Sequence, residues 1–539
     1  MTSNAANLDL ALIGNCAVSA LVDKRAAIVW CCAPRFDGDP IFHSLLGNAA
    51  GTQQDGVFSV ELEGFARSEQ AYDPSTAVVR TRLFDAAGEG IEVVDFCPRF
   101  LNRDRSFRPA QIVRRVRPLV GHPRVRFIVR PRGQWGTAAP EITRGSNHLR
   151  FILPAGVLRL NTNAPLTYVL DSTWFSLQVP VSLLLGPDET LSAGIEETAR
   201  DFEEQTALYW RRWTRRLAVP LEWQDAVIRA AITLKLCQFE ETGAIVAAMT
   251  TSIPEAPNSE RNWDYRFCWL RDAFFVVRAL NSLSEVGTME DYLRWLNDVV
   301  RSARGGHVQP LYGIGLEQVL AESTVPTLSG YRGMGPVRVG NQAYEHFQYD
   351  VYGNIVLGSS QAFFDHRLFR RADLRDFTEL EGMGEQAWRF HDQPDAGMWE
   401  LRTRARVHTS SSLMCWAACD RLAKIAAVIG KAASHAAWRT RADTIRAKIL
   451  EQSWSESRQA FVESFGGKDL DASVLLMAEV GFIDPRDPRF IKTVDALEAV
   501  LADGPFMRRY KRPTTSASPR ARSTCARSGG STRWRGSAA

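Results

Sequence analysis

The alternation of apolar and polar residues changes its period near residue 200. Before that point, apolar residues recur at every second position in short runs. In "VFSVELEG", Phe58, Val60 and Leu62 point one way and the polar residues between them point the other way. Gly, Pro, Asn and Asp separate the runs. Many short alternating strands favour an antiparallel sandwich with one buried face on each sheet. We therefore predict an N-terminal β-sandwich over residues 1–200.

From about residue 201 the apolar residues recur at the spacing of helices. In "TSSSLMCWAACDRLAKIAAVIG", the positions Cys415, Ala418, Leu422, Ile425 and Ile429 are three or four residues apart, and a Ser/Thr run precedes them. About nine such helices lie between 221 and 503, without recognisable strands. Strands first and helices afterwards indicate segregated domains. We predict a helical linker over 201–220 and a helical domain over 221–510. Periodicity leaves open a bundle, a solenoid or a closed barrel of helical hairpins.

The charge of the chain is concentrated at its end. The 539 residues carry a formal net charge of +4, while residues 511–539 contain seven Lys or Arg and no Asp or Glu. The rest of the chain is therefore mildly acidic (4 − 7 = −3). We expect no nucleic-acid partner and no membrane partner. Residues 511–539 also lack Leu, Ile, Val and Phe, so we predict a disordered basic tail.

The nine cysteines are scattered without a CxxC pair, and the nine histidines form no cluster. This distribution is typical of reduced, buried thiols in the cytoplasm, and we expect no metal site and no cofactor. No signal peptide and no apolar run of membrane-spanning length is recognisable, so the expected location is cytoplasmic. No pattern indicates an oligomeric state.

Aromatic and charged residues alternate in "NWDYRFCWLRDAFF", just before an apolar helix. The members of this segment are Trp263, Asp264, Tyr265, Arg266, Phe267, Trp269, Arg271 and Asp272. Aromatic faces beside carboxylates and guanidinium groups suit a sugar, whose C–H faces stack and whose hydroxyls need paired donors and acceptors. The alternative is a structural Arg–Asp pair with aromatic packing at a helix start, and composition alone does not decide between them.

A second segment, "PDAGMWELR", places a glutamate beside a tryptophan. Residues 395–397 have the composition of a turn, and Trp399 precedes Glu400. A carboxyl against an indole is partly desolvated, which raises its pKa and suits it to act as a general acid. The alternative is a solvated loop glutamate paired with Arg402 or Arg404.

Together these segments resemble glycoside hydrolase family 15, the glucoamylase and bacterial trehalase family. Four blocks occur in the expected order between about residues 9 and 510: "ALIGNCAVSALVDKRAAIVWCCAPRFDGDPIFHSLLG", "TTSIPEAPNSERNWDYRFCWLRDA", "GYRGMGPVRVGNQAYEHFQYDVYG" and "PDAGMWELR". The resemblance implies a β-sandwich joined by a helical linker to an (α/α)6 barrel, with the active site at the barrel mouth. It also implies an inverting, exo-acting α-glucosidase that releases glucose from α-glucan ends or from trehalose.

The resemblance also implies roles for individual residues. Glu400 matches the position of the general acid. Trp399 would form the wall of the site beside Glu400 and adjust its pKa. The residues that would contact the substrate glucose are Tyr265, Trp269, Arg271, Asp272 and Arg509.

The chain departs from the family pattern after "RRY". The family continues with a block close to DDFGxPE, which carries the general base, and then with the last barrel helix. This chain has "KRPTTSASPRARSTCARSGGSTRWRGSAA" instead. Codons for Pro513 to Ala517, read two bases further on, can encode Asp-Asp-Phe-Gly. We interpret the C-terminus as frameshifted, with the last helix missing; a designed basic tail is the alternative.

Two other functions stay open. Because the chain lacks the block that carries the general base in the family, it could also be a catalytically dead remnant that only binds carbohydrate. An inverting disaccharide phosphorylase on a similar barrel would use phosphate in place of the base and its water. The sequence does not distinguish trehalose from a maltooligosaccharide as substrate.

Overall fold

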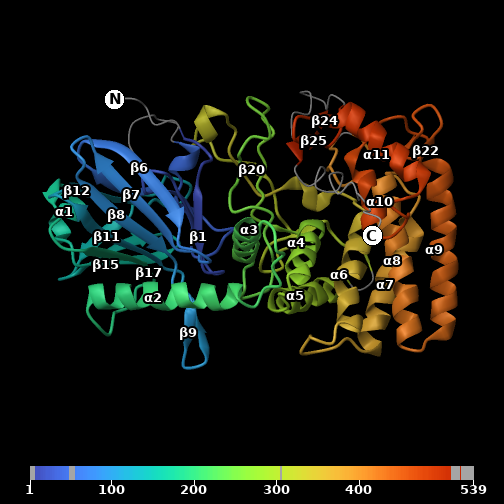
Figure 1. Ribbon diagram of the computed structural model, residues 1–539, viewed down its shortest axis with the longest axis horizontal. Helices are drawn as coiled ribbons and strands as arrows, with labels where there is room; N and C mark the ends of the chain where they lie inside the picture. Colours follow the sequence, from blue (N-terminus) through green and yellow to red (C-terminus); the bar gives the residue numbers. More distant parts are fainter. Residues whose placement is uncertain (1–5, 48–54, 304–305, 403, 512–521, 524–539) are drawn as a thin grey trace.

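Strands occupy the first part of the molecule and helices the second, as predicted (Figure 1). The computed structural model describes residues 6–47, 55–303, 306–402, 404–511 and 522–523. The predicted disordered tail and missing last helix lie outside the described residues, apart from Lys511 and a two-residue strand, β26 (Arg522–Ser523). This strand pairs with β25 (Phe506–Arg508).

The N-terminal part consists of two antiparallel sheets. The seven-stranded sheet contains β1 (Ala11–Gly14), β2 (Ser19–Val22), β3 (Ala27–Cys32), β4 (Pro40–Phe42), β5 (Val57–Leu62), β12 (Arg124–Arg130) and β16 (Phe175–Ser176). The eight-stranded sheet contains β6 (Phe65–Tyr72), β7 (Val79–Asp85), β8 (Gly90–Phe96), β11 (Ile112–Val120), β13 (Glu141–Arg144), β14 (His148–Leu153), β15 (Gly156–Thr162) and β17 (Val181–Gly186). Apolar side chains of both sheets form one core between them, which is the predicted sandwich.

One sheet is covered on both faces, which the alternating pattern did not predict. Every residue of β8 and β17 is buried. The long helix α2 (Ile195–Thr214) packs its Ala199 and Ala207 against Val94, Val113 and Leu184 on the outer face of the eight-stranded sheet (Figure 1). The helix predicted as a linker over 201–220 therefore begins within the range predicted for the sandwich and is part of its packing.

Nine α-helices follow among the described residues, in agreement with the number expected from periodicity. They are α3 (Gln224–Leu236), α4 (Leu270–Ser282), α5 (Gly287–Ala303), α6 (Asp350–Phe364), α7 (Leu374–Phe390), α8 (Thr409–Val428), α9 (Ala432–Gln452), α10 (Leu476–Glu479) and α11 (Pro488–Leu501). The Ser/Thr run that was expected to precede α8 lies inside its first turn. There the hydroxyls of Thr409 and Ser412 donate to the backbone carbonyls of Val462 and His391.

The expectation of no strands among these helices is wrong at four places. The short strands β18 (Cys268–Trp269) and β19 (Leu311–Tyr312) pair with each other, as do β20 (Ser323–Thr324) with β21 (Arg338–Val339), β22 (Trp454–Ser455) with β23 (Ala460–Phe461) and β24 (Ala502–Asp503) with β25. A strand of two residues is too short to show a period of two, so the pattern could not reveal it.

Polar contacts join the two halves. Trp30 in β3 donates its indole N–H to the carbonyl of Met249 at 2.7 Å. Arg99 donates to Glu240 at 2.7 Å. Burial opposes ionisation of Glu240, but the charges of Arg99 and Lys235 outweigh it and hold the pKa of Glu240 at about 2.

Candidate active site

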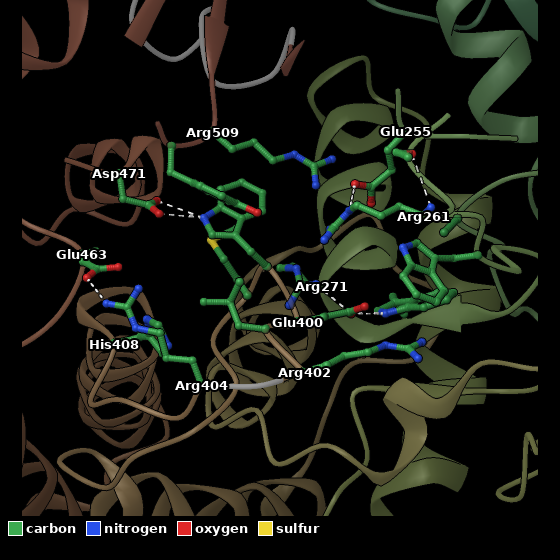
Figure 2. Close-up of a pocket in the computed structure, with 18 of the residues that line it drawn as sticks. Glu255, Arg261, Arg271, Glu400, Arg402, Arg404, His408, Glu463, Asp471 and Arg509 are labelled. Atoms are coloured by element: carbon green, nitrogen blue, oxygen red, sulfur yellow. Dashed lines mark hydrogen bonds and ion pairs between the residues drawn. The ribbon is translucent and has the colours of Figure 1, made fainter. Parts of the chain in front are cut away.

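A cavity of about 1130 Å³ opens in the helical half, where the start of α4 meets the turn before α8 and the segments around 463–471 and 509–511. It is lined by all seven residues predicted for the site: Tyr265, Trp269, Arg271, Asp272, Trp399, Glu400 and Arg509. Figure 2 shows Glu400 and Arg271 between a group on the right that includes Glu255 and a group on the left that includes Asp471. Residues far apart in the sequence therefore converge on one space.

Glu400 is carried by a tight turn. The Glu400 N–H donates to the carbonyl of Gly397, and the Leu401 N–H donates to that of Ala396, both at 3.1 Å. Gly397 has φ +67°, and a Cβ there would lie 2.7 Å from the ring of His408. Glu400 itself has φ +56°, a left-handed conformation that costs a residue with a side chain on the order of 1–3 kcal/mol. Such strain is typical of functional sites.

The Glu400 carboxylate lies between an indole and a guanidinium group. Trp269 donates its Nε1–H to Glu400 Oε1 at 2.6 Å, and Arg271 Nη2 lies 3.5 Å from the same oxygen. The Glu400 side chain is 22% exposed. Burial raises the pKa of Glu400 above its ordinary value, while Arg271 and the indole N–H act in the opposite direction. A carboxyl at a cavity wall whose pKa is raised is better suited to act as a proton donor.

The ion pairs suggested as the alternative for Glu400 are formed by other acids. Arg402 donates to Glu322 at 2.7 Å, and Arg404 donates to Glu463 at 2.7 Å. The arginine within ion-pair distance of Glu400 is Arg271, which comes from a different part of the chain.

Arg271 is held from behind by the start of α6. Its Nη1 donates to Gln348 at 3.0 Å and to Asp350 Oδ2 at 3.1 Å. The side chain of Asp350 is 2% exposed and that of Arg271 is 13% exposed. Asp272, whose Oδ2 lies 3.9 Å from Arg271 Nε, is 48% exposed and so is accessible from the cavity. The arginine is fixed while the neighbouring aspartate remains open to a ligand.

Tyr265 and Trp269 form an aromatic wall. Their ring centroids are 5.7 Å apart at an interplanar angle of 48°. The Tyr265 hydroxyl donates to Glu255 Oε1 at 3.4 Å, and Glu255 Oε2 accepts from Arg261 Nε at 2.6 Å. Burial raises the pKa of Tyr265, so the phenol stays protonated. The wall combines ring faces with a fixed hydroxyl.

Trp399 faces a different carboxylate from the one predicted. Its Nε1 lies 3.0 and 2.9 Å from the two oxygens of Asp471, and the guanidinium carbon of Arg509 lies 4.9 Å from its ring centroid. Asp471 is buried, which raises its pKa. The indole that donates to Glu400 is that of Trp269.

Several lining or supporting residues were missed by the sequence analysis: Glu255, Arg261, Gln348, Asp350, Glu463 and Asp471. Gln348 and Asp350 stand in "YEHFQYDVYG", part of a block that carries the family resemblance but in which no site residue was predicted. No residue spacing marked any of them. Gln348, Asp350, Glu463 and Asp471 contact partners that are 57 to 79 residues away in the sequence, and Glu255 and Arg261 pair within an irregular loop.

No metal site is evident among the described residues, since they contain no group of three or more His, Cys, Asp or Glu that could hold an ion. The eight cysteines that the structure describes are free. Within the described ranges, no helix has both the length and the apolarity that crossing a bilayer requires.

Known proteins resemble this chain over most of its length. A trehalase from Mycobacterium tuberculosis is 30% identical over 93% of this chain and 77% of its own length. A trehalase from Thermoplasma volcanium is 28% identical over 93% of this chain and 80% of its own length. A glucoamylase structure from Saccharomycopsis fibuligera shares 13% identity over 57% of this chain and 62% of that one, with a TM-score of 0.33, a likeness too weak to argue from.

Two family descriptions match the chain. "Trehalase-like, N-terminal" matches residues 2–164, the region of the sandwich. "Glycosyl hydrolases family 15" matches residues 223–520, which include the whole described helical region and every residue that was predicted to line the site. This match covers more than half of the chain. The chain therefore belongs to glycosyl hydrolases family 15.

Proposed function

We propose that the chain is an inverting, exo-acting α-glucosidase that acts on trehalose or on the end of an α-glucan, with Glu400 as general acid. The observation that carries the proposal is the position of Glu400 on the wall of the cavity, with its pKa raised by burial and its Oε1 2.6 Å from the Trp269 indole nitrogen. The relatives named trehalase favour trehalose among the two substrates.

In this proposal the terminal glucose stacks on Tyr265 and Trp269, and Arg271 and Asp272 bind its outer hydroxyls. Glu400 gives its proton to the glycosidic oxygen as the bond from that oxygen to C1 breaks. Water attacks C1 from the opposite face and loses a proton to a second carboxylate. Inversion requires the two carboxyls to be roughly 6.5–9.5 Å apart, so that a water fits between them.

The proposed reaction also requires a second carboxylate. The acids on the left side of the cavity already have strong partners: Asp471 accepts from Trp399, and Glu463 accepts from Arg404 and from Arg406 at 2.7 and 2.8 Å. The residues after Tyr510 do not match the block that carries the base in the family. We therefore expect this chain to bind glucosides and to hydrolyse them slowly, which is the behaviour of a carbohydrate-binding remnant.

The test uses this chain and a version whose reading frame is restored after Tyr510. Glu400→Gln in the restored version should lower the rate on trehalose or maltotriose by about 10²–10⁴ while sugar binding survives. Glu451→Gln, an exposed residue of α9, is the control and should change neither. Unchanged turnover of Glu400→Gln would refute the assignment of the acid.

The same assay separates the mechanisms. Inverting hydrolysis releases β-glucose from an α-glucoside, which proton NMR detects before mutarotation. A product of glucose 1-phosphate that requires added phosphate would identify a phosphorylase instead. Sequencing the coding DNA around Tyr510 checks the frameshift, because the alternate frame must encode Asp-Asp-Phe-Gly followed by a glutamate.

A further inference from the structure

Asp395 stands at the start of the turn that carries Glu400, and its side chain is buried, with 2% of the residue exposed. Its carboxylate accepts three hydrogen bonds. Oδ1 accepts from the N–H of Gly397 at 3.1 Å, and Oδ2 accepts from the N–H of Tyr349 at 2.8 Å and from the hydroxyl of Ser411 at 2.7 Å. The three donors belong to three separate segments of the chain, so one carboxylate joins all three.

Two of these segments carry residues of the candidate site. Tyr349 is the residue before Asp350, and Asp350 holds Arg271 at 3.1 Å. The turn that contains Gly397 ends in Glu400. The third segment is the first turn of α8, which contributes Ser411. Asp395 is therefore bonded on one side to the turn that carries Glu400. On the other side it is bonded to the backbone next to Asp350, which holds Arg271; Arg271 and Asp272 are called the glucose clamp below.

Backbone contacts attach the turn independently of this carboxylate. Asp395 and Arg406 exchange N–H···O bonds of 2.9 and 3.1 Å, and the Ala396 N–H donates to the carbonyl of Phe347 at 3.0 Å. Removing the negative charge of Asp395 therefore leaves the turn attached to its surroundings. We expect the loss of the charge to weaken the bond to Tyr349, and so to alter the alignment of the turn relative to the start of α6.

We propose that Asp395 is a positioning residue that fixes Glu400 and Arg271 relative to each other. The inference rests on the proposed function, because it assigns Asp395 an effect on the acid and the clamp named there. An asparagine cannot replace it, because one of its two terminal atoms is an NH₂ group. That group would face either the Gly397 N–H or the Tyr349 N–H, and donors that face each other repel.

The titratable and polar groups that face Asp395 come from α6, the residue before it and α8. From α6 and the residue before it, Asp350 and Tyr349 face it, and from α8, Ser411 and the Cys415 thiol face it. Burial raises the pKa of Asp395 to about 7, the Asp350 charge acts in the same direction, and the three hydrogen bonds oppose both. A carboxyl with a pKa of about 7 changes charge near neutral pH.

The first test compares leaving groups. Asp395→Asn in the frame-restored version should lose about 10²-fold on trehalose, the cost of displacing a catalytic group by about 1 Å. It should lose much less on α-glucosyl fluoride, because fluoride departs without a proton from an acid. Ser411→Ala removes the hydroxyl that donates to Asp395 Oδ2 and leaves the charge unchanged. It should lose about tenfold on trehalose, the cost of one hydrogen bond, and again less on α-glucosyl fluoride.

Asp392→Asn is the matched control, because Asp392 lies three residues earlier, on the same loop, and pairs with Lys448 instead. It should leave both rates unchanged. Equal losses on the two substrates, or no loss on either, would overturn the inference. If Asp395→Asn does not fold, the result for Ser411→Ala decides.

The second test needs no activity and uses this chain as it is. The Trp269 indole N–H donates to Glu400, so its ¹⁵N–¹H resonance follows the titration of that carboxyl; Trp269→Phe identifies the peak. In Asp395→Asn or Ser411→Ala the midpoint should shift, because Glu400 moves relative to Arg271. An unchanged midpoint in folded protein would overturn the inference. A wild-type, frame-restored protein that cleaves no α-glucoside would instead refute the proposed function and leave this measurement valid.

Discussion

Two arginines stand five residues apart in the segment "NWDYRFCWLRD", and the fold uses them differently. Arg266 is fully buried and binds Asp264 through two bonds of 2.9 and 2.8 Å. Its Nη1 donates to the carbonyl of Gly38 at 2.6 Å and lies 3.5 Å from the sulfur of Cys32. Arg271 lines the cavity, and its contacts to the nearest acids there, Glu400 and Asp272, are 3.5 and 3.9 Å long.

The difference lies in what the three guanidinium nitrogens contact: those of Arg266 all contact buried protein groups, and those of Arg271 do so only on the Nη1 side. Arg266 has partners on every side and serves packing, so the structural alternative considered for this segment describes Arg266 and Asp264. Arg271 is anchored on one side by Asp350 and faces the cavity with its remaining donors. An arginine that is half anchored and half open can still bind a ligand.

The largest effect that separates the two arginines is expected on activity. Arg271→Lys in the frame-restored protein keeps a positive charge beside Asp350 but loses the planar set of donors of the guanidinium group. The rate on trehalose should therefore fall by about 10²–10³. The melting temperature should change little. Kinetics and calorimetry on the same sample check this, and a large loss of stability at unchanged activity per folded molecule would make Arg271 another structural arginine.

Arg266→Lys should give the reverse result. The change leaves the Gly38 carbonyl and part of Asp264 without a donor in a buried place, at a cost of about 1–3 kcal/mol for each such group. We expect a lower midpoint in urea unfolding and an unchanged rate per folded molecule. A rate that falls as far as in Arg271→Lys would contradict the distinction between the two arginines.

A smaller effect is expected from the indole of Trp269, two residues before Arg271. Trp269→Phe removes the N–H that stabilises ionised Glu400, so the pKa of Glu400 should rise further. A hydrogen bond to a charged group is worth about 1.5–3 kcal/mol. The basic limb of the pH–rate profile should move to higher pH, because the acid then keeps its proton longer. Trp399→Phe is the control, since that indole donates to Asp471.

The smallest effect concerns stability and pH. Because the pKa of Asp395 is raised to about 7, the folded state binds a proton that the unfolded state releases between the ordinary carboxyl pKa and neutrality. This group therefore stabilises the fold less as pH rises from 4 to 7. The stability of the wild type relative to Asp395→Asn should decline over that window, as differential scanning calorimetry would show. A constant difference would mean that Asp395 is ionised throughout.

The sequence predicted the order of the domains and a set of residues that meet in one cavity. The period of apolar residues fixes the element type, and the composition of "NWDYRFCWLRDA" and "PDAGMWELR" points to the chemistry. It could not separate Arg266 from Arg271, because the partner of one is a carbonyl more than 200 residues away. Nor could it show that Trp269, and not Trp399, donates to Glu400, since both indoles precede charged residues in similar motifs. Such distinctions depend on long-range contacts.

The bond from Arg266 to Gly38 limits how this chain can be recombined. The two family descriptions end and begin at residues 164 and 223, which suggests two exchangeable modules. Yet Arg266, five positions before the cavity-lining Arg271, completes its hydrogen bonds with the backbone carbonyl of Gly38 in the other module. A fragment that starts at residue 223 would keep the Arg266–Asp264 pair but leave Arg266 Nη1 without the Gly38 carbonyl. A chimaera with a foreign sandwich would have to present a carbonyl at the same point to keep this bond.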